Sequence, residues 1–256
     1  MKLGRCALCL KTRKLEKSHI IPNSAFKPIK RELSGKVITV IDDKDTWVKY
    51  TNDSWWEYLL CSDCEDIFEK YETYSLGILK GAKKIEKVVH EQGVTFKNIN
   101  YGEFKLFLTS VLWRASVSKQ DVFSKVILHP SWAEEARLSL LNKKALPPLK
   151  LGCKLSKLND PVPGGTFTEE SLQQFVISPI PRRNRRTVSF LFAYSGYLFE
   201  YFSPAILYGD SRSKGVLKKS CIFLIPYQSI TGVPELLDVM VSGLEKDVKG
   251  MVKFKS

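Results

Sequence analysis

The fold of the first part of the chain is decided by two short stretches, Cys6-Ala7-Leu8-Cys9 and Leu59-Leu60-Cys61-Ser62-Asp63-Cys64-Glu65. Each contains two cysteines separated by two residues, a spacing that lets two thiolates reach one ion from a single turn. Zn²⁺ prefers four soft ligands in a tetrahedron, and two such pairs supply four. We therefore predict a closed structural zinc site formed by Cys6, Cys9, Cys61 and Cys64.

Two other interpretations of these cysteines are four unrelated buried thiols and a redox Cys-x-x-Cys motif. No stretch of the sequence is as apolar and long as a membrane span or a secretory leader, so we expect a cytoplasmic protein without a membrane partner. In a reducing compartment paired cysteines indicate a metal site, and a redox motif needs no second copy. Cys153 and Cys221 stand alone and are expected to be small buried thiols.

The charge balance predicts a polyanionic partner. Lysine and arginine number 40 against 27 aspartates and glutamates, a formal net charge of +13. Each phosphate that such a surface neutralises releases condensed counterions, so nucleic acid is the expected partner, with DNA favoured over RNA. The same charge could also serve solubility alone. The candidate phosphate-binding residues are Lys27, Lys30 and Arg31, and Arg182, Arg183, Arg185 and Arg186 in a turn whose alternative interpretation is plain solvation.

Periodicity predicts an α+β protein in three parts. Residues 1–90 form the zinc module, in which Cys61 opens a helix that continues through the apolar positions up to about residue 89. Residues 91–148 form a helical segment, with helices over 103–118 and 131–143, the second capped by Ser131. Residues 149–256 form a β-rich domain of unknown type, with strand-like runs that include 203–209 and a helical pattern over 234–250.

His19 stands out from the other two histidines, His90 and His129, which we expect to be structural. It lies in Lys17-Ser18-His19-Ile20-Ile21-Pro22, between the two cysteine pairs. This combination resembles the HNH (His-Me finger) endonucleases over about the first 75 residues. The resemblance implies a treble-clef or ββα-metal module in which His19, at the end of the first strand, is the general base that activates water for attack on a phosphodiester.

The resemblance also implies a divalent cation, Mg²⁺ or Mn²⁺, held by oxygen ligands. Many members of that family carry Asp before the base and His or Asn in the closing helix, where this chain has Ser18 and Glu65. Glu65 is the first candidate for a metal-binding catalytic carboxylate and Glu69, one turn later, the second. For Glu69 and Glu72 the alternative is a solvated helix face paired with Lys70.

Three functional hypotheses follow. The first is a metal-dependent endonuclease, of a family that often occurs in phage-defence, restriction and mobile-element proteins. The second is a zinc-dependent protein that binds nucleic acid or assists assembly without catalysis. In the third, the C-terminal sheet binds a protein or small-molecule regulator and the first module is its effector. The sequence contains no phosphate-binding Gly-Lys-Ser/Thr loop and no dinucleotide fingerprint, so it offers no support for nucleotide hydrolysis or redox cofactors.

Overall fold

The computed structural model describes residues 2–32, 37–39, 48–51, 54–81, 85–162, 167–183, 186–239 and 252–254, with side chains in 28–53 and 240–256 outside the description. The first part contains β1 (Lys2–Arg5), β2 (Thr12–His19), α1 (Asn23–Glu32), β3 (Val37–Thr39), β4 (Val48–Thr51), β5 (Trp56–Cys61) and α2 (Ser62–Leu79). Then follow β6 (Lys87–His90), β7 (Gly93–Phe96), α3 (Tyr101–Val117) and α4 (Pro130–Leu141). The last part contains β8 (Cys153–Asn159), α5 (Glu169–Gln173), β9 (Val176–Arg183), β10 (Val188–Tyr194), β11 (Tyr197–Ser203), β12 (Phe223–Ser229) and β13 (Val252–Phe254).

A seven-stranded sheet forms one side of the molecule, in the order β6-β7-β12-β8-β11-β10-β9. Neighbouring strands are antiparallel except β8 and β12, which run parallel. The turn between β10 and β11 is Ser195-Gly196, and both residues have positive φ, at 54° and 77°. Such a turn matches the right-handed twist of the two strands that it joins.

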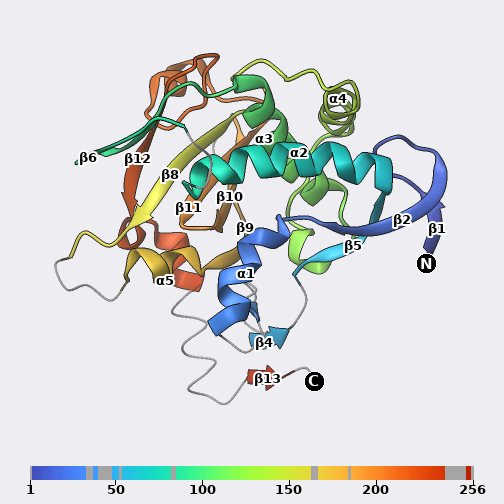
Figure 1. Ribbon diagram of the computed structural model, residues 1–256, viewed down its shortest axis with the longest axis horizontal. Helices are drawn as coiled ribbons and strands as arrows, with labels where there is room; N and C mark the ends of the chain where they lie inside the picture. The colour runs from blue at the N-terminus through green and yellow to red at the C-terminus, as the bar shows by residue number, and fades with distance from the viewer. Residues whose placement is uncertain are drawn as a thin grey trace.

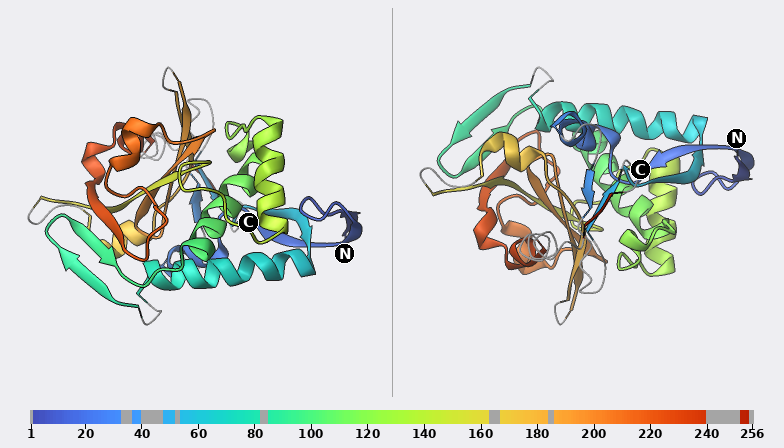
Figure 2. Two further views of the ribbon diagram at one scale, coloured as in Figure 1. Left: turned by 90° about the horizontal axis from the view of Figure 1, so that it is seen from above. Right: turned by 90° about the horizontal axis from the view of Figure 1, so that it is seen from below.

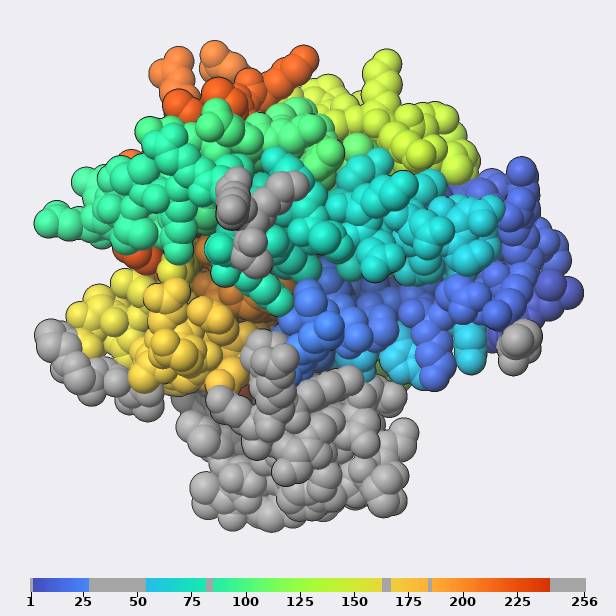
Figure 3. All heavy atoms as spheres, viewed as in Figure 1, coloured from blue at the N-terminus to red at the C-terminus, as the bar shows by residue number. Residues whose placement is uncertain are grey.

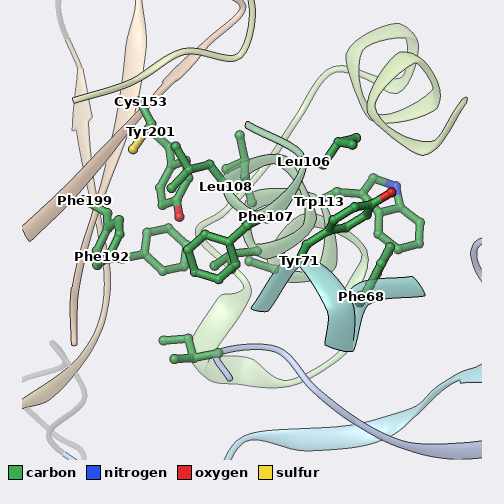
Figure 4. Close-up of a cluster of buried hydrophobic side chains, with 14 of the residues drawn as sticks. Phe68, Tyr71, Leu106, Phe107, Leu108, Trp113, Cys153, Phe192, Phe199 and Tyr201 are labelled. Atoms are coloured by element: carbon green, nitrogen blue, oxygen red, sulfur yellow. The ribbon is translucent and has the colours of Figure 1, made fainter. Parts of the chain in front are cut away.

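The helix α3 lies between this sheet and α2 (Figure 1), and the two further views show α2, α3 and α4 on one side of the sheet (Figure 2). The other face of the sheet packs against α5 and residues 230–239. Every residue of α3 from Phe104 to Ala115 is buried. Figure 4 shows Phe107 and Leu108 beside Phe192 and Tyr201 of the sheet, while Trp113 lies beside Phe68 of α2. This stretch of the helix is therefore buried on all sides.

A three-stranded sheet of order β1-β2-β5 carries the first cysteine pair and leads into α2. One cluster of buried apolar side chains runs from Cys6 to Ile225, so this small sheet and the seven-stranded sheet share a core. The mixed class and the sheet-rich C-terminal part are confirmed. The boundaries at residues 90 and 148 stay a prediction, and β6 and β7, on either side of the first, both join the large sheet.

Several local predictions were wrong for identifiable reasons. The helix that Cys61 opens ends at Leu79, before Gly81 with φ of 71°, and residues 87–90 are strand instead of helix. Residues 203–209 include the end of β11 but continue into a 3₁₀ turn at Tyr208–Arg212. Of the helical pattern over 234–250, residues 234–239 are helical and the remainder lies outside the described residues.

The N-terminus of α4 also differs from the prediction. Its cap is His129, whose ring accepts a bond from the backbone N–H of Ser131, because Pro130 takes the first helical position, where a missing N–H costs nothing. His90 is exposed and bonds Thr95 across the β6–β7 hairpin. Both histidines thus have the structural roles expected of them. Cys153 is buried as predicted, whereas Cys221 is exposed.

Candidate functional site

The two cysteine pairs meet at one point. The four sulfur atoms of Cys6, Cys9, Cys61 and Cys64 all lie within 4.8 Å of one another, and those of Cys9 and Cys61 are 3.9 Å apart. A tetrahedral zinc with Zn–S bonds of about 2.3 Å requires sulfur atoms about 3.8 Å apart. The donor set and its spacing therefore fit a divalent cation such as zinc.

Hydrogen bonds hold the two cysteine turns in place. Leu10, with φ of 62°, closes the first turn by donating its N–H to the carbonyl of Cys6, and the N–H of Cys61 points to the sulfur of Cys6 at 3.4 Å. From α4, Arg137 donates to the carbonyl of Leu8 at 2.6 Å. The site is thus built by three segments that are far apart in the sequence.

Burial opposes the thiolate form of Cys61 and Cys64, whereas at Cys9 burial is outweighed by hydrogen bonds, which lower the pKa. Burial raises the pKa of Cys61, and it raises the pKa of Cys64 further with help from the nearby charge of Cys6. Because a metal binds the thiolates, binding releases protons, and the affinity of such a site falls as the solution becomes more acidic.

His19 ends β2, the strand that pairs with β5 ahead of α2 (Figure 1). Its Nε2 atom lies 2.9 Å from the hydroxyl oxygen of Ser54, which is buried. The next residue, Trp55, has a positive φ of 50° and packs edge-on against Phe26 and Phe123. A bulky residue in this conformation is strained, and its packing holds Ser54 against the histidine ring.

Arg114 of α3 connects the backbone of His19 to the helix α2. Its guanidinium donates to the carbonyl oxygen of His19 at 2.5 Å and pairs with the carboxylate of Glu72. The Arg114 side chain is 1% exposed and lies over the ring of Phe68, 5.2 Å from its centroid. These contacts make Arg114 a residue that positions the end of β2.

Three carboxylates of α2 lie along one face of the helix beside this link. Burial raises the pKa of Glu72, Arg114 opposes that effect, and the charges of Glu65 and Glu69 raise it further, so the three are electrostatically close. One oxygen of Glu65 is buried without a hydrogen-bond partner among the described residues. An orphaned buried carboxylate oxygen of this kind fits a hard cation, which takes oxygen ligands.

Of the other two carboxylates, Glu69 fits the expected solvated helix face and Glu72 does not. Glu69 is exposed, in keeping with a solvated helix face, and α2 lies open at the surface in the space-filling view (Figure 3). Glu72 instead pairs with Arg114, a partner that lies 42 residues away in the sequence.

Ser18 has a structural role beside the histidine. It is fully buried, and its hydroxyl oxygen accepts a hydrogen bond from the N–H of Leu60 at 3.0 Å. This bond spans the irregularity in the pairing of β2 and β5, which falls between Glu16 and Lys17. Ser18 therefore secures the strand pair and offers no carboxylate to a metal.

An aromatic strip runs away from His19 on the same face of the small sheet. Its members are Trp56, Tyr58, Lys17 and Lys2, none of which the sequence motifs had indicated as functional. The register puts His19 opposite Trp56 and Lys17 opposite Tyr58, and opposed residues of an antiparallel pair share a face. The ammonium of Lys17 lies 4.3 Å from the Trp56 ring, that of Lys2 lies 5.9 Å from the Tyr58 ring, and the two rings meet edge-on.

The predicted basic residues are not all equivalent. Lys27 on α1, and Arg183 and Arg186 beside the β9–β10 connection, are exposed. Arg182 pairs with Glu235 through two nitrogens, at 2.5 and 2.7 Å, and also faces Glu200. The side chains of Lys30 and Arg31, as well as Arg185, lie outside the described residues. Arg182 thus has carboxylate partners already, whereas Lys27, Arg183 and Arg186 face solvent.

Comparison with known proteins adds no further information: no family model, curated protein or solved structure matches the chain. Within the described residues, none of the helices has the length and apolar character needed to cross a bilayer. The function of this chain must therefore be inferred from the geometry of His19, the carboxylates of α2 and the four cysteines.

Proposed function

We propose that this protein is a metal-dependent endonuclease of the HNH type, with His19 as the general base and a structural zinc in the cluster of four cysteines. The observation that carries the proposal is the position of His19. It ends a strand next to the helix of Glu65, and it is held by Ser54 at its ring and by Arg114 at its backbone. Two paired strands followed by a helix are also what the resemblance to these nucleases implies, and Glu65 stands in that helix where many members carry His or Asn.

The ring contact with Ser54 suits a general base. An imidazole titrates near neutrality, so a neutral ring can accept a proton from water at cellular pH. The Ser54 hydroxyl beside Nε2 restricts the orientation of the ring. Arg114 holds the end of β2 in place, so it would affect cleavage only by positioning His19.

Glu65, with Glu69 next to it, would hold the Mg²⁺ or Mn²⁺ ion. Bound there, the cation would stabilise the negative charge that develops on the phosphate during cleavage. The buried, unpartnered oxygen of Glu65 supports this assignment, since such an atom costs free energy until a cation or donor reaches it. Phage-defence and mobile-element systems, in which such nucleases often occur, are the settings to examine for the cellular role.

The aromatic strip supports nucleic acid as the substrate. Aromatic rings stack on bases and lysines neutralise phosphates, and the strip places the half-buried Trp56, the exposed Tyr58 and two lysines next to His19. Exposed Lys27, Arg183 and Arg186 would add contacts to phosphates that are independent of sequence. Trp56→Ala should weaken binding of single-stranded DNA by about 1–3 kcal/mol. Trp132→Ala on α4, where Lys150 also lies over the indole ring, is the matched control and should leave binding unchanged.

Cleavage is tested with the purified chain and plasmid, linear duplex, single-stranded DNA or RNA, in Mg²⁺ or Mn²⁺ and in EDTA, with zinc content measured on each sample. We expect His19→Ala to lower the rate by about 10²–10⁴-fold at unchanged zinc content. Glu65→Gln should raise the concentration of Mg²⁺ that is needed. His90→Ala, an exposed histidine in the β6–β7 hairpin, should cleave like the wild type.

The second candidate function is binding of nucleic acid without catalysis. Ser18 favours it, because its hydroxyl is occupied by the N–H of Leu60 and many related nucleases carry a carboxylate at that position. In that case wild type and His19→Ala would bind equally and neither would cleave any of the four substrates. That result would replace the endonuclease proposal.

A further inference from the structure

A small cavity lies where the C-terminal end of α2 meets the seven-stranded sheet. It has a volume of about 50 Å³ and is lined on one side by Leu79 and Lys80, and on the other by the Ser195-Gly196 turn. The hydroxyl of Tyr197 donates to the carbonyl of Leu79 at 2.8 Å and fixes the helix end against the sheet. Figure 1 shows this end of α2 beside β8 and β10. The cavity is distinct from the cysteine cluster and from the surroundings of His19.

One hydroxyl of this lining, that of Ser195, has no hydrogen-bond partner among the described residues. Ser195 is 5% exposed, and its oxygen atom is buried without a hydrogen bond to any of the described residues. It occupies the first position of the β10–β11 turn at φ of 54°, a conformation that glycine or asparagine adopts at lower cost. A serine kept buried, unpaired and strained at this position has no evident structural benefit, which points to a ligand.

The cavity is also positively charged. Its lining includes Lys80, Lys87 and Lys157 against a single carboxylate, that of Glu169, so it carries a net formal charge of +2. Glu169 is already paired with Lys157 at 2.6 Å. Burial lowers the pKa of Lys80, with a smaller contribution from the charge of Lys27, and the Lys80 ammonium donates to the carbonyl of Ser24 at 2.8 Å.

We propose that this cavity binds one phosphate-class oxyanion, with the Ser195 hydroxyl donating a hydrogen bond and Lys87 and Lys80 supplying the charge. A bound water could accept the hydroxyl proton but would leave the excess positive charge uncompensated. The volume exceeds the roughly 10–15 Å³ that one water needs, and it suits one tetrahedral anion better than a nucleic-acid backbone.

Free inorganic phosphate and the terminal phosphate of a mononucleotide share this chemistry, and the test separates them. The full-length, zinc-loaded chain is titrated with inorganic phosphate and with 5′-AMP at constant ionic strength, by calorimetry and by thermal unfolding, with chloride as the reference salt. We expect phosphate or 5′-AMP to raise the Tm above its value in chloride. Tighter binding of 5′-AMP would support a nucleotide as the source, and equal or weaker binding would support free phosphate.

Two substitutions locate the binding in this cavity. Ser195→Ala should weaken phosphate binding about tenfold, because it removes one hydrogen bond to a charged group. It should not lower the Tm in chloride, because the hydroxyl has no hydrogen bond to lose among the described residues. Lys87→Gln should weaken binding to a similar degree. Lys218→Gln removes the same charge from an exposed position outside the lining and should bind like the wild type.

Three outcomes would overturn the proposal. The first is a wild-type Tm that neither phosphate nor 5′-AMP raises above its value in chloride, as expected of a cavity that holds only water. The second is wild-type affinity in both Ser195→Ala and Lys87→Gln. The third is a Ser195→Ala variant that unfolds well below the wild type in chloride, since the hydroxyl would then have a structural partner.

Discussion

Replacing Arg114 by methionine is the most informative perturbation of the candidate site. The methionine keeps most of the buried volume but removes the donors to the His19 carbonyl and to the Glu72 carboxylate. Removing one member of a buried ion pair leaves the other uncompensated. We expect a loss of about 3 kcal/mol, the lower end for such pairs, because the Glu72 side chain is 20% exposed and water can still reach it.

The measurement is urea unfolding of wild type, Arg114→Met, Glu72→Gln and the double variant, all with zinc bound. The two residues are in direct contact, so the double variant should lose about 1–2 kcal/mol less than the sum of the single variants. Arg137→Met is the control. Arg137 also bonds a carbonyl and a carboxylate, but its partner Glu134 is 53% exposed, and we expect a loss of about 1 kcal/mol.

Activity provides the second readout. Because Arg114 positions the strand end that carries His19, Arg114→Met should lower cleavage at temperatures where the variant is still fully folded. A loss of stability below about 1 kcal/mol, or additive effects of the two single substitutions, would refute the link between α3, His19 and Glu72. Unchanged cleavage by a folded Arg114→Met variant would refute the positioning role alone.

Three further predictions concern other parts of the molecule. Cys9→Ser should lower zinc affinity, and in the wild type zinc should dissociate progressively as pH falls, because protons compete for the thiolates; a colorimetric chelator measures both. Burial lowers the pKa of Lys105 to about 8, so between pH 8 and 9 its folded form holds fewer protons than its unfolded form. The unfolding free energy of wild type relative to Lys105→Met should therefore rise with pH, by at most about 1.4 kcal/mol per pH unit, and a flat or falling difference would contradict this. Gly215→Ala, where a Cβ would lie 2.1 Å from the carbonyl oxygen of Leu155 at φ of 82°, should lose more than about 2 kcal/mol on denaturation, whereas Gly209→Ala, with open space around it, should lose less than about 1.

The features that the sequence predicted correctly depend on short spacings. Two cysteines three positions apart must share a turn, and the apolar period after Cys61 specifies a helix, so the composition of the metal cluster and the start of α2 followed from local rules. The predicted helix ends were wrong where a single residue interrupts the apolar periodicity. Gly81 ends α2 before the apolar positions that follow it, and Pro130 transfers the cap of α4 to His129.

Tertiary structure decided which side chains meet. Ser54 and Arg114 reach His19 from 35 and 95 positions away, and no local pattern marks either of them as its partner. The same holds for the pairing of Arg182 with Glu235, which turns part of an apparently basic loop into a structural contact. Such contacts depend on how helices and strands pack, because a hydrogen bond or an ion pair is specified by distance in space and not by separation along the chain.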